Sequence, residues 1–491
     1  MNPGRLLVLV AGLLTALRLV LVFMEEPSPA EAYYFLCAQQ PAAAYFDGPA
    51  GTAFLAGAPA ALWRMQAPLW ALAATAACYL LIRGVGDAKI AAWTALGLNT
   101  LPLFNMAALR LGPLLPALTL SLLGMYLAWR AFGAEKRQVL RWLAAGVVIG
   151  AASCVDYAAF ALVPALFLFT VCSPNHRRSD DVLGLFIFLL IPALMLVPAL
   201  AWNASQEWIP IAGGTFRSLW EFDFFGFLRS ILQWMGSFSP ILLLLMFVVW
   251  GVTLRESKNH LRARFVFLVA LPGVLLGLYF ALRGKESDFL LLLAVPLLLF
   301  KLLSSAPVGG WRRMLVGVAF LFAILFSGYG MFNVFQTGQG WRSAAEATKR
   351  LFLEKSAQGN EGLFLIAGDP SLASVLGYHL RDELIPPAGH PTVYTGESQD
   401  ISNQFGLWPS YADFVETIEK PKDEYFTEQH GENPFVGRSA LYITHESPND
   451  VPQTIKAAFE VVTFLQMLDS VEGGKEPLYI YHCVNYQTLP L

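Results

Sequence analysis

Long, continuous runs of apolar residues constrain this chain more than any other feature. A helix needs about 20 apolar residues to cross the ~30 Å hydrocarbon core of a membrane. We identify eleven runs of roughly this kind, at residues 5–23, 52–82, 90–108, 114–132, 139–153, 157–173, 182–202, 229–252, 265–282, 288–305 and 314–333. The runs are continuous rather than alternating, which argues against a β-barrel. The sequence therefore predicts a mostly α-helical polytopic membrane protein with about eleven transmembrane helices.

The composition agrees with this prediction. Of the 491 residues, 56% are hydrophobic and 14% are charged, whereas soluble domains carry roughly 25% charged residues. So little polar surface cannot cover a water-soluble globule. The second run contains Pro59 and Pro68, and we expect a short surface helix there, followed by a span.

The charges in the connections predict the orientation. One alternate set of connections is rich in basic residues, namely Arg83, Lys89, Lys136, Arg137, Arg141, Arg177, Arg178, Arg255, Lys258, Arg262, Arg264, Arg312 and Arg313. The positive-inside rule places this set and the N-terminus in the cytoplasm. We expect an integral protein of a bacterial inner (plasma) membrane, with the first run retained as a span rather than cleaved as a signal.

The charge balance also divides the chain. Residues 334–491 hold 10 Lys and Arg against 21 Asp and Glu, while residues 1–333 hold 23 against 15. We predict a transmembrane domain over residues 1–336 and a C-terminal extracytoplasmic α/β domain over residues 337–491, because eleven spans place the C-terminus outside. Its expected strands are 363–367, 392–394, 440–444, 461–464 and 478–482, with helices at 341–356 and 371–380. Ser371 is a candidate N-cap, and no basic stripe indicates nucleic-acid binding.

The first outer connection places aromatic rings beside acids. It contains Glu31 and Asp47 together with Tyr33, Tyr34 and Tyr45, and it has no Lys or Arg. Tyrosines suit a membrane interface, and they equally suit a saccharide site in which rings stack on sugars. Both interpretations stay open for these three residues.

Other outer connections carry isolated ionisable residues. Arg110 follows the third run, Asp156 lies between the fifth and sixth, and Arg283 and Lys285 link the ninth and tenth. Ionisable groups at this depth are costly and are usually paired or functional. Arg283 and Lys285 could hold a phosphate, or they could extend to the headgroup level as a surface pair.

Three further features complete the outer face. Trp202 and Trp208 flank a polar segment and indicate an interfacial anchor, and residues 215–228 predict a helix along the membrane surface. Cys37 and Cys483 are both expected outside, where a disulfide could form. No Cys/His spacing predicts a zinc site.

Together these residues resemble the GT-C superfamily of membrane glycosyltransferases, specifically glycosyltransferase family 39 with its protein O-mannosyltransferases and aminoarabinose transferases. The family's first outer loop, D-E-A-Y-Y followed by Y-F-D-H-P-P, is similar to Ala30–Tyr34 and Tyr45–Ala50. Its later motifs are similar to Gly112–Pro116, Trp202–Trp208, Arg283–Lys285, Gly340–Arg342 and Asn403–Pro409. The likeness thus runs along nearly the whole chain.

The resemblance implies transfer of a sugar from a polyprenyl-phosphate donor to a lipid, glycan or protein acceptor at the outer leaflet. Asp47 and Glu31 would deprotonate or orient the acceptor, with Tyr33, Tyr34, Tyr45 and Asp156 lining the site. Arg283, Lys285 and Arg110 would hold the donor phosphate. No cofactor is indicated, except that the family's acids could position a divalent metal ion.

The chain departs from the family at three positions. Ala30 stands where the family has its proposed base, Gly48 replaces a histidine, and Leu114 replaces an aspartate. A catalytically inactive relative that binds a lipid-linked glycan or a partner protein is therefore the main alternative. A transporter fits less well, since the sequence shows no internal repeat.

Overall fold

The computed structural model describes the chain except residues 1, 60–61, 134–137, 174–180, 212–222, 285–287, 306–309, 338–339, 359–361, 397–400, 413–432, 449, 469–476 and 488–491. In the described part, six helices are long and apolar enough to cross a membrane: α1 (Pro3–Met24), α4 (Gln66–Val85), α7 (Leu114–Phe132), α10 (Asp181–Ser205), α14 (Leu261–Ala281) and α16 (Trp311–Thr337). The helices α12 (Phe224–Phe238) and α13 (Pro240–Glu256) form a bent seventh segment.

Four shorter apolar segments complete the bundle: α5 (Ala88–Leu98), α8 (Gln138–Ser153), α9 (Leu162–Val171) with the preceding turn η1 (Tyr157–Ala161), and α15 (Asp288–Ser305). Each of the eleven predicted runs thus contains a helix in the described part of the chain, although only six, or seven with the bent pair, are long and apolar enough to cross a membrane. The protein is an integral membrane protein. The second run divides as expected into the short helix α3 (Gly51–Ala56) and the span α4. The small helices α6 (Pro102–Ala107) and α11 (Ile209–Ile211) follow α5 and α10.

The eighth run is not the single straight span that we predicted. Helices α12 and α13 meet at an angle of 100° at Ser239, whose φ is +69°. Pro240 follows directly and cannot donate a helical hydrogen bond, so the chain turns there. Phe224, Phe225 and Leu228 of α12 are exposed while Trp234 is buried. The surface helix therefore lies at 224–238, and most of the predicted range 215–228 lies outside the described residues.

A polar cluster ties α1 to the centre of the bundle. Arg18 is 1% exposed, and its Nη2 donates to the side-chain oxygens of Asn99 at 3.2 Å and Asn105 at 2.5 Å. The Asn105 amide donates in turn to Ser327 of α16 at 3.2 Å. Because unsatisfied polar groups are costly in a membrane, such a cluster fixes how these helices pack.

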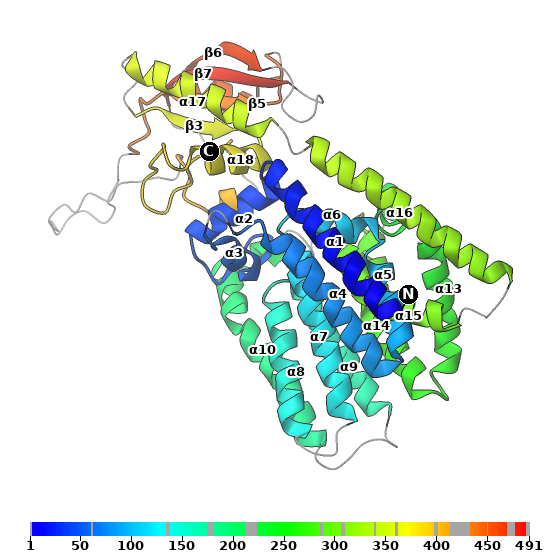
Figure 1. Cartoon of the computed structure of the whole chain (residues 1–491). Coiled ribbons are helices and arrows are strands. Elements are labelled where there is room, and N and C mark those ends of the chain that lie inside the picture. Colours follow the sequence, from blue (N-terminus) through cyan, green and yellow to red (C-terminus); the bar gives the residue numbers. More distant parts are fainter. Residues whose placement is uncertain are drawn as a thin grey trace, which may run out of the picture.

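The C-terminal part forms a five-stranded sheet with helices beside it (Figure 1). The order is β4 (Tyr394–Thr395), β3 (Phe364–Ala367), β5 (Ala440–Thr444), β7 (Leu478–Tyr486) and β6 (Phe459–Leu468). Strand β3 is parallel to β4 and β5, while β7 is antiparallel to β5 and β6. The helices are α17 (Trp341–Ala357), α18 (Pro370–Leu380) and α19 (Gln453–Ala458), with the turn η4 (Gln404–Gly406).

Alternate residues of each strand enter different cores, as the period of two requires. Leu365 and Ala367 pack with α18, whereas Phe364 and Ile366 pack on the opposite face. Asp369, and not Ser371 as predicted, is the N-cap of α18: its Oδ1 accepts from the backbone N–H groups of Ser371 and Leu372. Cys37 and Cys483 are buried in the two different cores, and both are free thiols.

The sheet-bearing part sits directly on the connection between α1 and α4. Helix α18 packs against α2 (Pro29–Gln39), a helix that is absent from our predictions. Arg381 stacks on Phe35 of α2, with its guanidinium carbon 5.2 Å from the ring centre. The backbone N–H of Arg342 donates to Glu26 at 2.9 Å. These contacts fix the sheet-bearing part relative to the connection between α1 and α4.

Close packing of α14 on α15 gives a direct test of this bundle. A Cβ added at Gly273 would lie 2.4 Å from the backbone oxygen of Leu290, and backbone atoms cannot move aside easily. We expect Gly273→Ala to destabilise the protein by about 1–3 kcal/mol, measured as a lower thermal-unfolding midpoint in detergent. Gly251→Ala is the matched control, since nothing lies within 4 Å of its Cβ position. Equal midpoints for the two variants would contradict the packing.

Candidate functional site

The start of α2 is fixed by a capping box. The Ser28 hydroxyl accepts from the backbone N–H of Glu31, and the Glu31 carboxylate accepts from the backbone N–H of Ser28 at 3.0 Å. Pro29 occupies the first helical position, where its missing N–H costs nothing. The sequence Ser-Pro-Ala-Glu carried this signal, so α2 could have been predicted.

Glu31 is also the centre of a buried ion pair. Its side chain is fully buried and lies 3.2 Å from Nε of Arg64, and its Oε1 accepts from the backbone N–H of Leu111 at 3.0 Å. Arg64 additionally donates to the carbonyl oxygens of Val22 and Glu25. This carboxylate therefore joins the end of α1, the start of α2 and the segment before α7.

Arg110, predicted to hold phosphate, pairs with a carboxylate instead. Its Nη2 lies 2.8 Å from Oε1 of Glu25 and donates to the carbonyl oxygen of Val334 at 2.9 Å. The Glu25 side chain is 1% exposed. The Arg110 side chain thus links the end of α1 to α16. Its pairing with Glu25 leaves Arg110 fewer donors for a ligand.

Asp47 lies at the tip of a two-residue β-turn between β1 (Ala44–Tyr45) and β2 (Gly48–Pro49). Gly48 has φ +154°, a conformation open to glycine and strained for other residues. The backbone N–H of Phe46, next to Asp47, donates to Oε1 of Gln404 at 2.7 Å, and Gln404 is 3% exposed. The sheet-bearing part thus holds the Asp47 turn in place.

A close backbone contact brings Asp156 to the same place. The N–H of Gly51 donates to the carbonyl oxygen of Cys154 at 2.9 Å, and a Cβ at Gly51 would lie 2.5 Å from that oxygen. Asp156 then caps η1 by accepting from the backbone N–H of Ala158 at 2.9 Å. Only glycine permits this approach of the first outer loop to the turn between α8 and η1.

Two adjoining cavities meet at the two aspartates. The smaller, about 70 Å³, is lined by Tyr33, Tyr34, Tyr45, Asp47, Gly48, Pro49, Thr52, Pro113, Val155, Asp156 and Tyr157. The larger, about 880 Å³, is lined by Asp47, Leu103, Pro113, Leu114, Asp156, Tyr157, Ala158, Phe160, Ala193, Leu196, Leu200, Ile211, Leu276, Phe280, Phe289 and Leu290. An apolar chamber between α7, α10, α14 and α15 thus ends at two carboxylates and a tyrosine-lined recess.

The environment shifts the acidity of these groups. Burial raises the pKa of Asp156 to about 6, although the hydrogen bond from Ala158 opposes the shift. Loss of solvation also raises the pKa of Asp47, and Tyr33 beside it partly offsets this. The pKa of Tyr34 is raised by burial and by the nearby negative charges of Asp47 and Asp156. The two carboxyls therefore exchange protons closer to neutral pH than ordinary aspartates.

The remaining predicted residues are placed as follows. Tyr45 donates its hydroxyl to the carbonyl oxygen of Cys37 at 2.7 Å, which stabilises the loop while its ring lines the recess. Arg283 lies over the Tyr279 ring, 4.7 Å from its centre, and its buried Nη2 has no hydrogen-bond partner among the described residues. Lys285 lies outside the described residues.

Tyr157 is a site residue that sequence reasoning did not select. It lines both cavities, and its hydroxyl accepts from the Asn203 side-chain amide at 3.1 Å. Asn203 belongs to the Trp202–Trp208 motif that we had interpreted as a membrane anchor. Trp208 is 45% exposed, so the motif is compatible with both roles. In the described part of the chain, no cluster of three or more His, Cys, Asp or Glu residues could hold a metal ion.

Replacement of Glu31 tests whether it holds the loop. Removing one partner of a buried ion pair leaves the other charge uncompensated and typically costs about 3–5 kcal/mol. We expect Glu31→Gln and Arg64→Gln each to lower the thermal-unfolding midpoint strongly, and the double variant to lose less than the sum. Glu354→Gln, on the exposed face of α17, is the control. An unchanged midpoint in Glu31→Gln would contradict the structural role.

Comparison with known proteins agrees with this architecture. Residues 49–202 match the family model described as dolichyl-phosphate-mannose-protein mannosyltransferase. This range begins two residues after Asp47, includes Asp156 and ends at Trp202, one residue before Asn203. No curated protein sequence matches the chain significantly.

Solved structures of glycosyltransferases share the fold at low sequence identity. ArnT from Cupriavidus metallidurans in the apo state has a TM-score of 0.58 and 14% identity over 97% of both chains. The same protein bound to undecaprenyl phosphate has a TM-score of 0.54 and 15% identity, again over 97% of both. The arabinofuranosyltransferase AftD from Mycobacteria has a TM-score of 0.50 and 13% identity over 98% of this chain and 40% of that one. The chain thus has the fold of the GT-C membrane glycosyltransferases.

Proposed function

We propose that this protein transfers a sugar from a polyprenyl-phosphate donor to a lipid, glycan or protein acceptor at the outer leaflet. The observation that carries the proposal is the apolar chamber of about 880 Å³ that ends at Asp47 and Asp156. Such a chamber suits a lipid tail, while its carboxylate end suits the reacting sugar. The undecaprenyl phosphate bound by ArnT supports a donor of this chemical class.

The proposed reaction is an inverting displacement. Asp47 takes the proton of the acceptor hydroxyl, whose oxygen attacks the anomeric carbon of the sugar. The bond from that carbon to the phosphate oxygen breaks, and the polyprenyl phosphate leaves with the electron pair. Arg283, whose Nη2 is unpartnered among the described residues, stabilises the negative charge that develops on the phosphate.

The contacts of Glu31 and Arg110 favour other roles for them. Glu31 is fully buried and paired with Arg64, and Arg110 is paired with Glu25. We therefore propose that both residues hold the loop. Asp156 orients the acceptor beside Asp47, with Tyr33, Tyr34 and Tyr157 around the sugar.

The inactive relative is the second candidate, and specific positions favour it. Leu114, where the family has an aspartate, lines the large cavity, and Gly48, where the family has a histidine, lines the small one. A protein that had lost catalysis would still bind the lipid-linked sugar in the same chamber.

Transfer assays separate these candidates. With a labelled polyprenyl-phosphate sugar and purified protein, we expect Asp47→Asn to reduce the transfer rate by about 100-fold or more, because a general base contributes about 10²–10⁴-fold. Asp382→Asn, whose side chain is 78% exposed on the outer part, is the matched control. Donor binding without transfer, over a range of acceptors, would support the inactive relative. Undiminished transfer by Asp47→Asn would reject Asp47 as the base.

The pH profile gives an independent test. The Asp156 carboxyl has a pKa raised to about 6, so it is protonated below this pH and ionised above it. If ionised Asp156 orients the acceptor, the transfer rate rises from pH 5 to pH 7 and then levels. The residual transfer activity of Asp156→Asn should not show this rise near pH 6. A rate that is constant over this range in the native protein would contradict the assignment.

A further inference from the structure

A third cavity, of about 660 Å³, lies at the other end of the helix bundle from the two aspartates. It is lined by Gly86, Asp87, Ile90, Trp129, Glu256, Asn259, His260, Leu261, Arg262, Ala263, Val266, Phe300, Lys301 and Ser304. Helix α15 contributes Phe289 to the apolar chamber proposed to hold the donor, called the donor chamber below, and Phe300 to this cavity. The two cavities therefore open at opposite ends of the same helices, and the proposed reaction makes no use of this one.

The acids of this cavity are already engaged. Glu256 of α13 forms an ion pair with Lys301 of α15, and the Lys301 side chain is only 15% exposed. Asp87 is the N-cap of α5, where its Oδ1 accepts from the backbone N–H groups of Lys89 and Ile90 at 2.9 Å. Their negative charges are thus offset by a cation and by a helix N-terminus.

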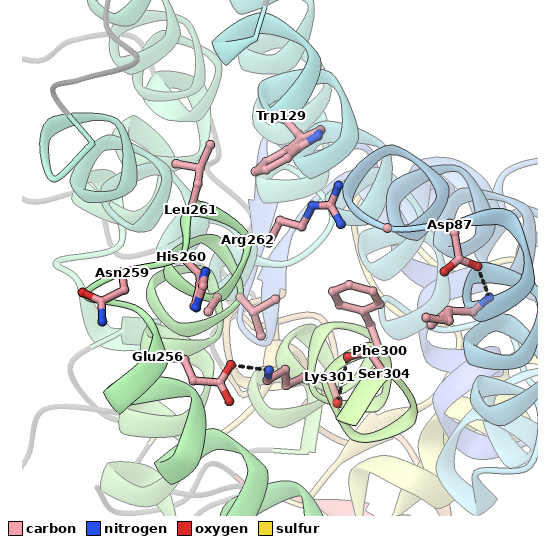
Figure 2. A pocket seen from close by; sticks show the side chains of 14 residues that line it. Asp87, Trp129, Glu256, Asn259, His260, Leu261, Arg262, Phe300, Lys301 and Ser304 are labelled. Carbon is pink, nitrogen blue, oxygen red and sulfur yellow. Dashed lines mark hydrogen bonds and ion pairs between the residues drawn. The ribbon is translucent and has the colours of Figure 1, made fainter. Parts of the chain in front are cut away.

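Arg262 is the cation that remains available. Its side chain extends into the space between Trp129 and Phe300, while the Glu256–Lys301 pair lies at the wall (Figure 2). Among the described residues, no carboxylate pairs with this guanidinium. A guanidinium presents several donors in a planar fork that matches the oxygens of a phosphate.

The surroundings add to the positive potential. The described residues near this cavity also include Arg83, Lys89, Lys258 and Arg264. The first turn of α14 lines the cavity, and its N-cap residue His260 makes no side-chain capping bond. Backbone N–H groups of a first helical turn have no partner within the helix and favour an anion.

The other half of the lining is apolar. Ile90, Val266, Phe300 and the Trp129 ring form this half, and the Trp129 Nε1 is satisfied by the carbonyl oxygen of Gly84 at 2.9 Å. A small inorganic anion would leave this apolar surface uncovered, whereas an acyl chain would cover it. The cavity therefore suits a phosphate joined to a lipid better than a free phosphate.

We propose that this cavity binds the phosphate of an anionic phospholipid, with Arg262 as the principal contact and the Ile90–Phe300 side receiving the start of an acyl chain. The lipid would come from the leaflet at the end of the bundle opposite the transfer site. It would bridge α5, α7, α14 and α15, and so stabilise the helices that also enclose the donor chamber.

Binding by the full-length protein in an uncharged detergent tests this proposal. Native mass spectrometry would follow retention of added phosphatidylglycerol by the native chain, by Arg262→Gln and by the matched control Arg255→Gln. Arg255 is exposed at the same end of the bundle but does not line the cavity. We expect retention to weaken at least about tenfold in Arg262→Gln, to stay unchanged in Arg255→Gln, and to fall as the salt concentration rises.

A second variant and a competition experiment distinguish lipid binding from the alternatives. Ile90→Trp keeps every charge and fills the apolar half, so it should also release the lipid; thermal unfolding would verify that each variant is folded. Displacement of the lipid by millimolar inorganic phosphate would support a phosphate contact in the cavity. It would, however, identify the ligand as a free phosphate from solution rather than a phospholipid. Equal retention by the native chain and folded Arg262→Gln, or equal losses in Arg262→Gln and Arg255→Gln, would overturn the proposal.

Discussion

The buried ion pair between Glu31 and Arg64 is the interaction on which the candidate site depends. Removing two such charges from water is costly, and the pair persists because every available donor is used: Arg64 also donates to three backbone carbonyl oxygens, and Glu31 also accepts from Ser28 and Leu111. The pair fixes the start of α2 against the end of α1. Helix α2 in turn supports α18 and the sheet behind it. The Asp47 turn is then held from one side by this scaffold and from the other by Gln404.

Much of the fold could be predicted because its determinants are local. Apolar run length identifies the spans, and short apolar runs with β-branched and aromatic residues identify β3, β5 and β7 to within a few residues. The concentration of acids and tyrosines in the connection after the first span predicts a site in this region. There Asp47, Asp156 and three tyrosines line one recess. The capping box of α2 is equally local, but its signal lies in the spacing of Ser28 and Glu31 and not in the charge of the loop.

The rest could not be predicted because it depends on partners far apart in the chain. Glu31 and Arg64 are separated by 33 positions, and Glu25 and Arg110 by 85. No local pattern distinguishes an arginine that meets a ligand from one that meets a distant carboxylate. The bend at Ser239 is intermediate: Pro240 marked a break, but the direction of α12 is set by burial of Trp234 and Phe238 against the bundle.

Leu114, a position where this chain departs from the family that it resembles, affects the chemistry that the site can support. Leu114 lines the chamber beside Asp47 and Asp156, so the side chain that replaces the family's aspartate is apolar where a third carboxylate would stand. Metal ligands must be deprotonated, and both remaining carboxyls have raised pKa values. A carboxyl whose pKa lies nearer to neutral pH is a better proton acceptor for catalysis than an ordinary aspartate. If Asp47 and Asp156 act as proposed, the loss of charge at Leu114 favours proton transfer over cation binding at this site.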